Sequence, residues 1–142
     1  MERQINDIRD LIQEIAWHFG DHEFNGERCG GLTFVEFMAL KKIDESEYLS
    51  IQEVGRALNF TKSGATRLVN RLQTKKYIKR EQSSKDGRVC CITLSSEGRN
   101  ALNAIAGKYG EYLEKVLREL DQEQTELLGR ILQLLANITK RE

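Results

Sequence analysis

The sequence predicts a mainly helical protein with one small β hairpin, an α+β arrangement. Three observations predict it. The 142 residues include no proline, so no ring interrupts a helix by removing a backbone N–H. Apolar residues recur at steps of three and four along much of the chain, as they do on one face of a helix. Only two short β-like runs occur, on either side of an Asp86-Gly87 pair that is typical of a hairpin turn.

The first helix is expected at the N-terminus, where one apolar face can be followed for several turns. Gly20 ends this helix, and the polar, glycine-containing residues 21–31 indicate a loop. The residues of the apolar face are Ile5, Ile8, Ile12, Ile15 and Phe19.

Each of the next three helices is expected to begin at a side chain whose oxygen accepts a hydrogen bond from the first helical turn. The helices run to about residue 43, to near residues 58–59 and to about residue 75. Their caps are Thr33 with Glu36 as a capping box, Ser50 with Glu53 as a second box, and Thr61 alone.

The β-like runs, residues 77–82 and 88–94, follow and are joined by residues 83–87. Ser95 or Ser96 caps a long helix, and Asp121 caps the last one. The order is α-α-α-α-β-β-α-α. Within the single chain of residues 1–142, residues 32–98 are therefore expected to form a winged helix-turn-helix lobe. Residues 1–20 and 99–142 are expected to form N- and C-terminal dimerisation helices.

Positive charge gathers in the middle of the chain. From Gly55 to Cys90, ten lysines and arginines oppose two acids, a formal charge of +8. The whole chain has 22 residues of each sign, so the remainder carries −8. A basic module on an acidic scaffold is typical of a protein that presents one face to a polyanion such as nucleic acid.

The fourth helix places an apolar stripe opposite a polar, basic face, as in a helix that lies in a DNA major groove. Arg67 is best suited to pair with guanine through two hydrogen bonds, whereas the flanking cations suit phosphates. A solvated surface helix is the alternative, but no acid occurs from Thr61 to Arg80. The predicted contacts are Lys62, Ser63, Thr66, Arg67, Asn70, Arg71 and Lys75.

The tip of the hairpin is the second candidate contact with DNA. Lys85 and Arg88 flank the turn, and Arg88 could enter a narrow minor groove. Asp86 would be repelled by phosphate, so we expect it to orient Arg88 or to accept from a nearby backbone N–H. An ordinary hairpin turn is the alternative interpretation.

These stretches resemble the MarR (multiple-antibiotic-resistance-regulator) family of transcription regulators. The resemblance is carried by LTFVEFMALKKI at 32–43, by SIQEVGRALNFTKSGATRLVNRLQTKKYIKR at 50–80 and by SKDGRVCCITLSSEGR at 84–99. It implies a homodimeric repressor on a near-palindromic double-stranded operator, with Arg88 as the wing arginine. It also implies release from DNA by a small, often phenolic, ligand or by an oxidant. One departure is Lys76, where the family often has glycine.

The terminal helices carry more apolar residues than a small winged lobe can cover. Leaving such a patch in water is unfavourable by roughly 25 cal/mol for each Å², and a closed two-fold dimer is the commonest way to cover it. An intramolecular bundle of the three terminal helices is the alternative. The residues expected at a dimer interface are Ile5, Ile8, Ile12, Leu117, Leu128, Ile131, Leu135 and Ile138.

The three cysteines suggest at most a redox signal. Their odd number and the absence of a secretion signal argue against a disulfide scaffold. Cys90 shares a strand face with Ile92, so Cys91 is expected to face outward. Cys91 and Cys29 are the candidate redox residues. His18 and His22 are expected to be surface or packing residues rather than metal ligands.

Neither a membrane segment nor an enzyme is expected. The chain lacks an apolar run near the 20 residues that span a bilayer, which favours the cytoplasm. It also lacks a glycine-rich phosphate loop, a metalloprotease motif and a nucleophile elbow, so we expect no cofactor. Two alternatives remain open, a winged-helix module that docks another protein and a thiol- or metal-sensing regulator.

Overall fold

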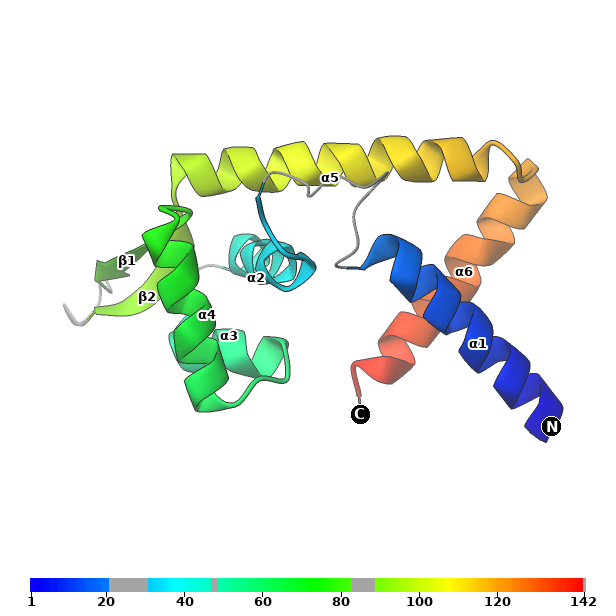
Figure 1. Ribbon diagram of the computed structural model, residues 1–142, viewed down its shortest axis with the longest axis horizontal. Coiled ribbons are helices and arrows are strands. Elements are labelled where there is room, and N and C mark those ends of the chain that lie inside the picture. The colour runs from blue at the N-terminus through cyan, green and yellow to red at the C-terminus, as the bar shows by residue number, and fades with distance from the viewer. Residues whose placement is uncertain (21–30, 47–48, 83–88, 142) are drawn as a thin grey trace. The chain divides into compact units, whose positions relative to one another are not determined.

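The computed structural model describes residues 1–20, 31–46, 49–82 and 89–141. Its helices and strands follow the predicted order, which confirms the mainly helical fold with a two-stranded wing (Figure 1). The elements are α1 (Glu2–Phe19), α2 (Phe34–Glu45), α3 (Ile51–Ala57), α4 (Lys62–Thr74), β1 (Ile78–Gln82), β2 (Val89–Leu94), α5 (Ser96–Leu117) and α6 (Gln122–Thr139).

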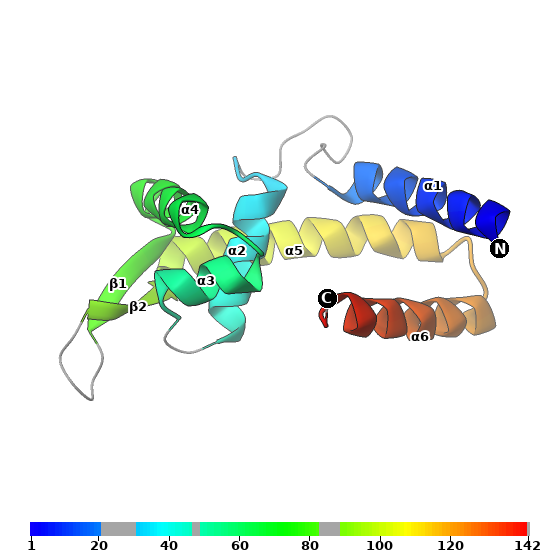
Figure 2. The same cartoon turned by 90° about the horizontal axis from the view of Figure 1, so that it is seen from below.

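The chain divides into two compact units. The first, Met1–Ala106, contains the predicted winged lobe, and the second, Gly107–Glu142, contains the end of α5 and all of α6. Within the first unit, α3 and α4 lie side by side as a helix-turn-helix, as Figures 1 and 2 both show.

Side-chain caps begin the helices where the sequence placed them. Thr33 and Glu36 form a complete capping box, in which Thr33 Oγ1 accepts from the Glu36 amide at 3.1 Å and Glu36 Oε1 accepts from the Thr33 amide at 3.2 Å. Thr61 Oγ1 accepts from the Gly64 amide at 3.1 Å. Asp121 and Gln124 form a second complete box at the start of α6.

The caps of α3 and α5 refine the prediction. Ser50 Oγ accepts from the Glu53 amide, but the Glu53 carboxylate accepts from the Ser50 hydroxyl, so only one bond of the expected box forms. Ser95, not Ser96, caps α5, because its hydroxyl accepts from the Gly98 amide at 3.0 Å.

The core of the winged lobe lies among α2, α3, α4, the hairpin and the first turns of α5. A fully buried aliphatic side chain stabilises a fold by about 1.5–3 kcal/mol relative to an exposed one. The lobe is therefore stabilised mainly by its own apolar side chains, which are Leu32, Phe37, Ala39, Leu40, Ile43, Val54, Ala65, Leu68, Val69, Leu72, Ile78, Cys91, Ile92, Leu102 and Ile105.

Two glycines allow close backbone approaches in this core. A Cβ at Gly98 would lie 1.9 Å from the Tyr77 carbonyl oxygen, so only glycine lets α5 start against the end of the turn that precedes β1. A Cβ at Gly55 would lie 3.0 Å from the Ala65 Cβ, so glycine also lets α3 pack tightly against α4. Gly55 therefore helps to hold α4, and Gly98 holds α5 against the turn that follows α4.

The wing is antiparallel from the pair Ile78–Leu94 to the pair Glu81–Cys91, where a bulge shifts the register. The expectation that Cys91 faces outward is wrong, because Cys91 is 3% exposed and the adjacent Ile92 is 2% exposed. Neighbouring strand residues point to opposite faces, so both faces of β2 are covered here, whereas the prediction assumed one solvated face. The Cys91 sulfur is also disulfide-bonded.

The terminal helices α1 and α6 contain no buried residue. Their apolar side chains stay largely in solvent, with Ile8 57% and Ile131 54% exposed. Among the described residues, no helix combines the length and apolar character needed to cross a bilayer.

Candidate nucleic-acid interface

Helix α4 turns a polar, basic face to solvent because its apolar stripe is completely covered. Ala65, Leu68, Val69 and Leu72 are each at most 1% exposed. The predicted division of the helix into two faces is thus confirmed. Six residues of the opposite side are exposed and Thr66 is half-buried; the exposed ones are Lys62, Ser63, Arg67, Asn70, Arg71 and Thr74.

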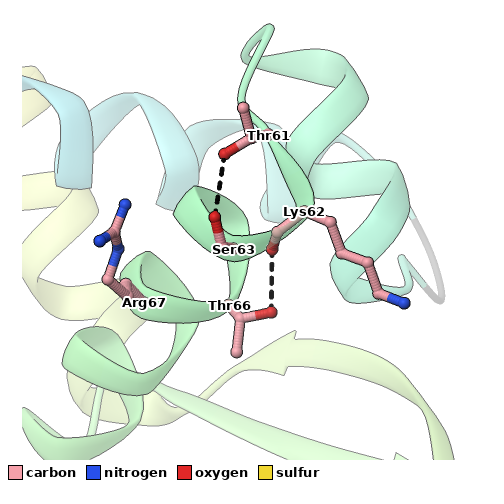
Figure 3. A pocket seen from close by; sticks show the side chains of 5 residues that line it. All are labelled: Thr61, Lys62, Ser63, Thr66 and Arg67. Carbon is pink, nitrogen blue, oxygen red and sulfur yellow. Dashed lines mark hydrogen bonds between the residues drawn. The ribbon is translucent and has the colours of Figure 1, made fainter.

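The N-terminal turns of α4 form an open hollow lined by hydroxyls and cations (Figure 3). Ser63 Oγ lies 3.3 Å from Thr61 Oγ1, and Thr66 Oγ1 donates to the Lys62 carbonyl at 2.9 Å. Figure 3 shows the Lys62 and Arg67 side chains extending away from each other on either side of these hydroxyls. Free amides and the helix dipole favour an anion at such an end.

Arg80 of β1, which is not among the DNA contacts predicted from the sequence, joins this face. Its Nε donates to Gln73 Oε1 at 3.2 Å, and its Nη2 is 3.4 Å from Asn70 Oδ1. The hairpin folds back along α4 and brings a further guanidinium to it. No local pattern signals this, because Arg80 and Asn70 are on different elements joined by a turn.

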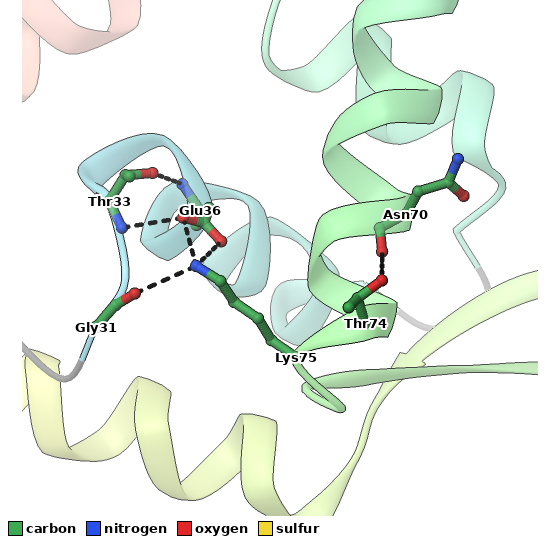
Figure 4. A network of polar contacts seen from close by, with 6 residues as sticks. All are labelled: Gly31, Thr33, Glu36, Asn70, Thr74 and Lys75. Carbon is green, nitrogen blue, oxygen red and sulfur yellow. Dashed lines mark hydrogen bonds and ion pairs between the residues drawn. The ribbon is translucent and has the colours of Figure 1, made fainter.

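Lys75, by contrast, is engaged inside the lobe (Figure 4). Its Nζ donates to Glu36 Oε2 at 2.8 Å, to Glu36 Oε1 at 3.0 Å and to the Gly31 carbonyl at 3.2 Å. The sequence predicts that Lys75 flanks α4 near phosphate. The structure gives its ammonium an intramolecular partner 39 residues away, which the helical pattern could not reveal.

Glu36 is charged in this setting although it is only 2% exposed. Burial raises the pKa of its carboxyl, but hydrogen bonds from Lys75 and the Thr33 amide, together with the Lys75 charge, outweigh burial and hold that pKa below its usual 4.5. The ion pair with Lys75 is therefore formed at neutral pH.

The turn from α4 to β1 has a left-handed residue where the sequence departs from the family pattern. Lys76 has a φ of 64°, a conformation that glycine adopts most easily. The Tyr77 amide donates to the Leu72 carbonyl at 3.0 Å, which closes the helix just before the wing.

The wing tip lies outside the described residues, and the roles of Lys85, Asp86 and Arg88 stay predictions. Cys29 and His22 also lie outside them. Cys91, the other redox candidate, is buried and disulfide-bonded, and a redox role for either cysteine stays a prediction. Within the described ranges, no group of three His, Cys, Asp or Glu residues could hold a metal ion.

Known proteins with a related sequence are bacterial regulators. The family model of the MarR family matches residues 30–89. The uncharacterised HTH-type transcriptional regulator YxaD of Bacillus subtilis is 28% identical over 107 residues, 75% of each chain. The HTH-type transcriptional regulator PrsX of Escherichia coli is 33% identical over 99 residues, which are 68% of this chain but only 60% of PrsX.

Solved structures of other proteins share the fold. Streptococcus pneumoniae FabT in complex with DNA aligns with a TM-score of 0.78 over 99% of both chains at 21% identity, a likeness of fold alone. A Mycobacterium tuberculosis MarR family protein in complex with salicylic acid aligns with a TM-score of 0.59 at 27% identity. That alignment covers 74% of this chain and 78% of the other.

Proposed function

Because the chain belongs to the MarR family of DNA-binding transcriptional regulators, we propose that it is a homodimeric, sequence-specific repressor that a small ligand or an oxidant releases from its operator. Its relatives are transcription regulators, which confirms the expectation that it is not an enzyme. What remains to be proposed is which residues read DNA, how the dimer forms and what controls it.

The exposed face of α4 is the observation that carries this proposal. It holds Lys62, Arg67 and Arg71 in solvent while every apolar residue of the helix is buried. Residues 61–80 contain no acid to neutralise these cations. Recognition helices usually contact bases through their N-terminal half, which here carries Lys62 to Arg67. Arg67 can pair with guanine through two hydrogen bonds, while Lys62 and Arg71 suit phosphates.

Asn70 and Arg80 extend the proposed contact surface along the helix. An asparagine amide can pair with adenine through two hydrogen bonds, and the Arg80 guanidinium beside it limits how Asn70 can turn. When DNA approaches, Arg80 can exchange its neutral partners for a phosphate, because hydrogen bonds to an ionised acceptor are roughly twice as strong. We therefore add Arg80 to the proposed DNA contacts.

Dimerisation is supported by the apolar faces of α1 and α6, which nothing within the described chain buries. A second copy would cover them by two-fold symmetry and would place two α4 helices about 34 Å apart, in successive major grooves. The proposed interface residues are those predicted from the sequence on the helices α1, α5 and α6.

Control by a small molecule is proposed on the resemblance to relatives. One solved structure with the same fold and 27% identity is a complex with salicylic acid. We therefore expect a phenolic carboxylate, or another effector of similar size, to weaken DNA binding by this chain. A panel of such compounds, titrated into a preformed protein–DNA complex, tests this part of the proposal.

Selection from random duplex oligonucleotides with the purified full chain tests the main proposal. We expect enrichment of a near-palindrome whose half-sites lie one helical turn apart, and binding that weakens steeply with salt. Failure to enrich any duplex, or a log–log salt slope near zero, would instead support a winged-helix module that docks a protein.

A further inference from the structure

Lys75 has used its whole hydrogen-bonding capacity inside the lobe. A lysine ammonium has three N–H donors and no acceptor. The structure gives it three acceptors, both oxygens of Glu36 and the Gly31 carbonyl, at 2.8–3.2 Å. No donor of Lys75 remains for a phosphate, although its side chain is still 37% exposed.

The partner of Lys75 is equally committed. Glu36 is 2% exposed and belongs to the first turn of α2, where its carboxylate also accepts from the Thr33 amide. One buried carboxylate thus connects the start of α2 with Lys75, the C-cap residue of α4. An unpaired charge at such a site is strongly unfavourable, so the pair resists separation.

We propose that Lys75 is a positioning residue for DNA recognition: with Glu36 it fixes the direction of α4, and it does not itself contact DNA. This inference rests on the function proposed above. It deepens that function by separating residues that touch DNA from a pair that orients the helix which does.

The length of α4 explains why a tether at its far end affects base reading. Lys62 and Lys75 are separated by 13 residues, about 20 Å along the axis at 1.5 Å per residue, so a tilt of about 5° moves the N-terminal turn by roughly 2 Å. Hydrogen bonds to base edges do not survive such a displacement. Contacts with phosphates do, because long cationic side chains can follow the DNA backbone.

A positioning role and a phosphate contact therefore predict different binding behaviour. Loss of a positioning residue lowers affinity for the operator but leaves non-specific affinity and the salt dependence unchanged. Loss of a phosphate contact weakens binding to all sequences and reduces the log–log salt slope by about 0.9.

The experiment uses the full-length dimer and measures Kd for the selected operator and for a scrambled duplex, each from about 50 to 200 mM salt, the range in which phosphate contacts show their effect. The variants are Lys75→Met, Glu36→Gln and both together. Lys62→Met is the matched control, since Lys62 is an exposed lysine at the other end of α4. Circular dichroism checks that each variant is folded.

We expect Lys75→Met and Glu36→Gln each to weaken operator binding about tenfold, the usual order for one lost specific contact, with less than about twofold change on the scrambled duplex. The salt slope stays at the wild-type value. The double variant is no weaker than the weaker single variant, because both changes break one interaction. Lys62→Met lowers affinity for both duplexes and reduces the slope by about 0.9.

The inference is overturned if Lys75→Met reduces the slope as Lys62→Met does, or if Glu36→Gln binds the operator like wild type. Should a single variant unfold, the apolar pair Glu36→Leu/Lys75→Met replaces it, since such pairs often keep stability. In that variant an unchanged slope supports positioning and a reduced slope refutes it. If the wild type selects no duplex at all, the proposed function fails first and this role falls with it.

Discussion

Helices α4 and α6 have the same kind of amphipathic sequence but opposite surroundings. In α4, Leu68 and Leu72 are 1% and 0% exposed. In α6, Ile131 and Leu135 are 54% and 41% exposed, and no residue of that helix is buried. The apolar stripe of α4 is buried within the winged lobe, whereas that of α6 is exposed among the described residues.

The difference separates two tasks of the molecule. The winged lobe buries its apolar core within a single chain. This core holds the backbone of α4 in place, and the basic face of α4 stays in solvent. Helix α6 has no buried residue among the described contacts, and exposed apolar area is unfavourable at roughly 25 cal/mol per Å². A second copy would both cover α6 and pair the two basic faces.

The largest effect is expected from a charge in the apolar face of α6. Leu135→Glu would place an unpaired carboxylate in the proposed interface twice, once from each copy, so we expect the dimer dissociation constant to rise by about 10³-fold or more. Sedimentation equilibrium measures it. Gln133→Glu, on the same helix but outside the proposed interface residues, is the control and should leave the dimer intact. A dimer unaffected by Leu135→Glu would place the interface elsewhere.

The next largest effect is expected on the free energy of unfolding, when a leucine of α4 and a leucine of α6 are each truncated to alanine. Leu68→Ala in α4 should lower the free energy of unfolding by about 2–5 kcal/mol, as expected for a fully buried leucine. Leu132→Ala in α6, measured by urea unfolding in the Leu135→Glu monomer, should lower it by less than about 1 kcal/mol because the side chain is 52% exposed. Equal losses would mean that α6 is covered within its own chain, and would remove the reason for a second copy.

A smaller effect, and one that depends on pH, is expected at Glu36. Its pKa is lower in the folded chain than the usual 4.5, so ionised Glu36 stabilises the fold above that pH, and this stabilisation is lost as the pH falls through the folded-state pKa. Glu36→Gln should therefore destabilise the lobe by about 2 kcal/mol at pH 7, the order for a hydrogen bond to a charged group.

Urea unfolding at pH 7 and below pH 4 checks this prediction. The difference in unfolding free energy between Glu36→Gln and wild type should become smaller in acid, because the carboxyl of wild-type Glu36 also becomes neutral there. Glu53→Gln is the matched control, because Glu53 occupies the corresponding turn of α3 but is exposed. If that difference were the same at pH 7 and below pH 4, the charge of Glu36 would contribute nothing to the stability of the lobe.

The smallest effect is expected at the turn between α4 and the wing. Lys76 has a φ of 64°, which strains a residue with a side chain. Lys76→Gly should relieve that strain and stabilise the lobe by up to about 1 kcal/mol. The urea concentration at the unfolding midpoint should rise, and the slope of the unfolding free energy against urea concentration should not change. A lower midpoint would mean that the Lys76 side chain stabilises the turn more than its backbone strains it.

Local patterns predicted most of the fold. The helix caps at Thr33, Thr61 and Asp121 act within four residues of chain, so they can be read from the sequence, as can the buried stripe of α4. Ser50 shows the limit of predicting caps from the sequence. Its hydroxyl accepts from the Glu53 amide as expected, but the Glu53 carboxylate accepts from the Ser50 hydroxyl and not from the Ser50 amide.

Interactions between distant residues were not predictable in this way. Lys75 fits a basic flank of α4 until folding brings Glu36 to it, and Arg80 reaches α4 only because the hairpin turns back. Cys91 was expected in solvent because the alternation rule describes a strand with one open face, and β2 has both faces covered at this point.

The most direct test of the central claim reverses the charge on the exposed face of α4. In the double variant Arg67→Glu/Arg71→Glu, the buried stripe is untouched, so the chain should keep its helical circular dichroism and its dimer. We predict that affinity for the selected operator falls to the non-specific level, a loss of about 10³-fold or more. Operator binding retained at wild-type strength by the folded double variant would contradict the account, because α4 could not then be the element that reads DNA.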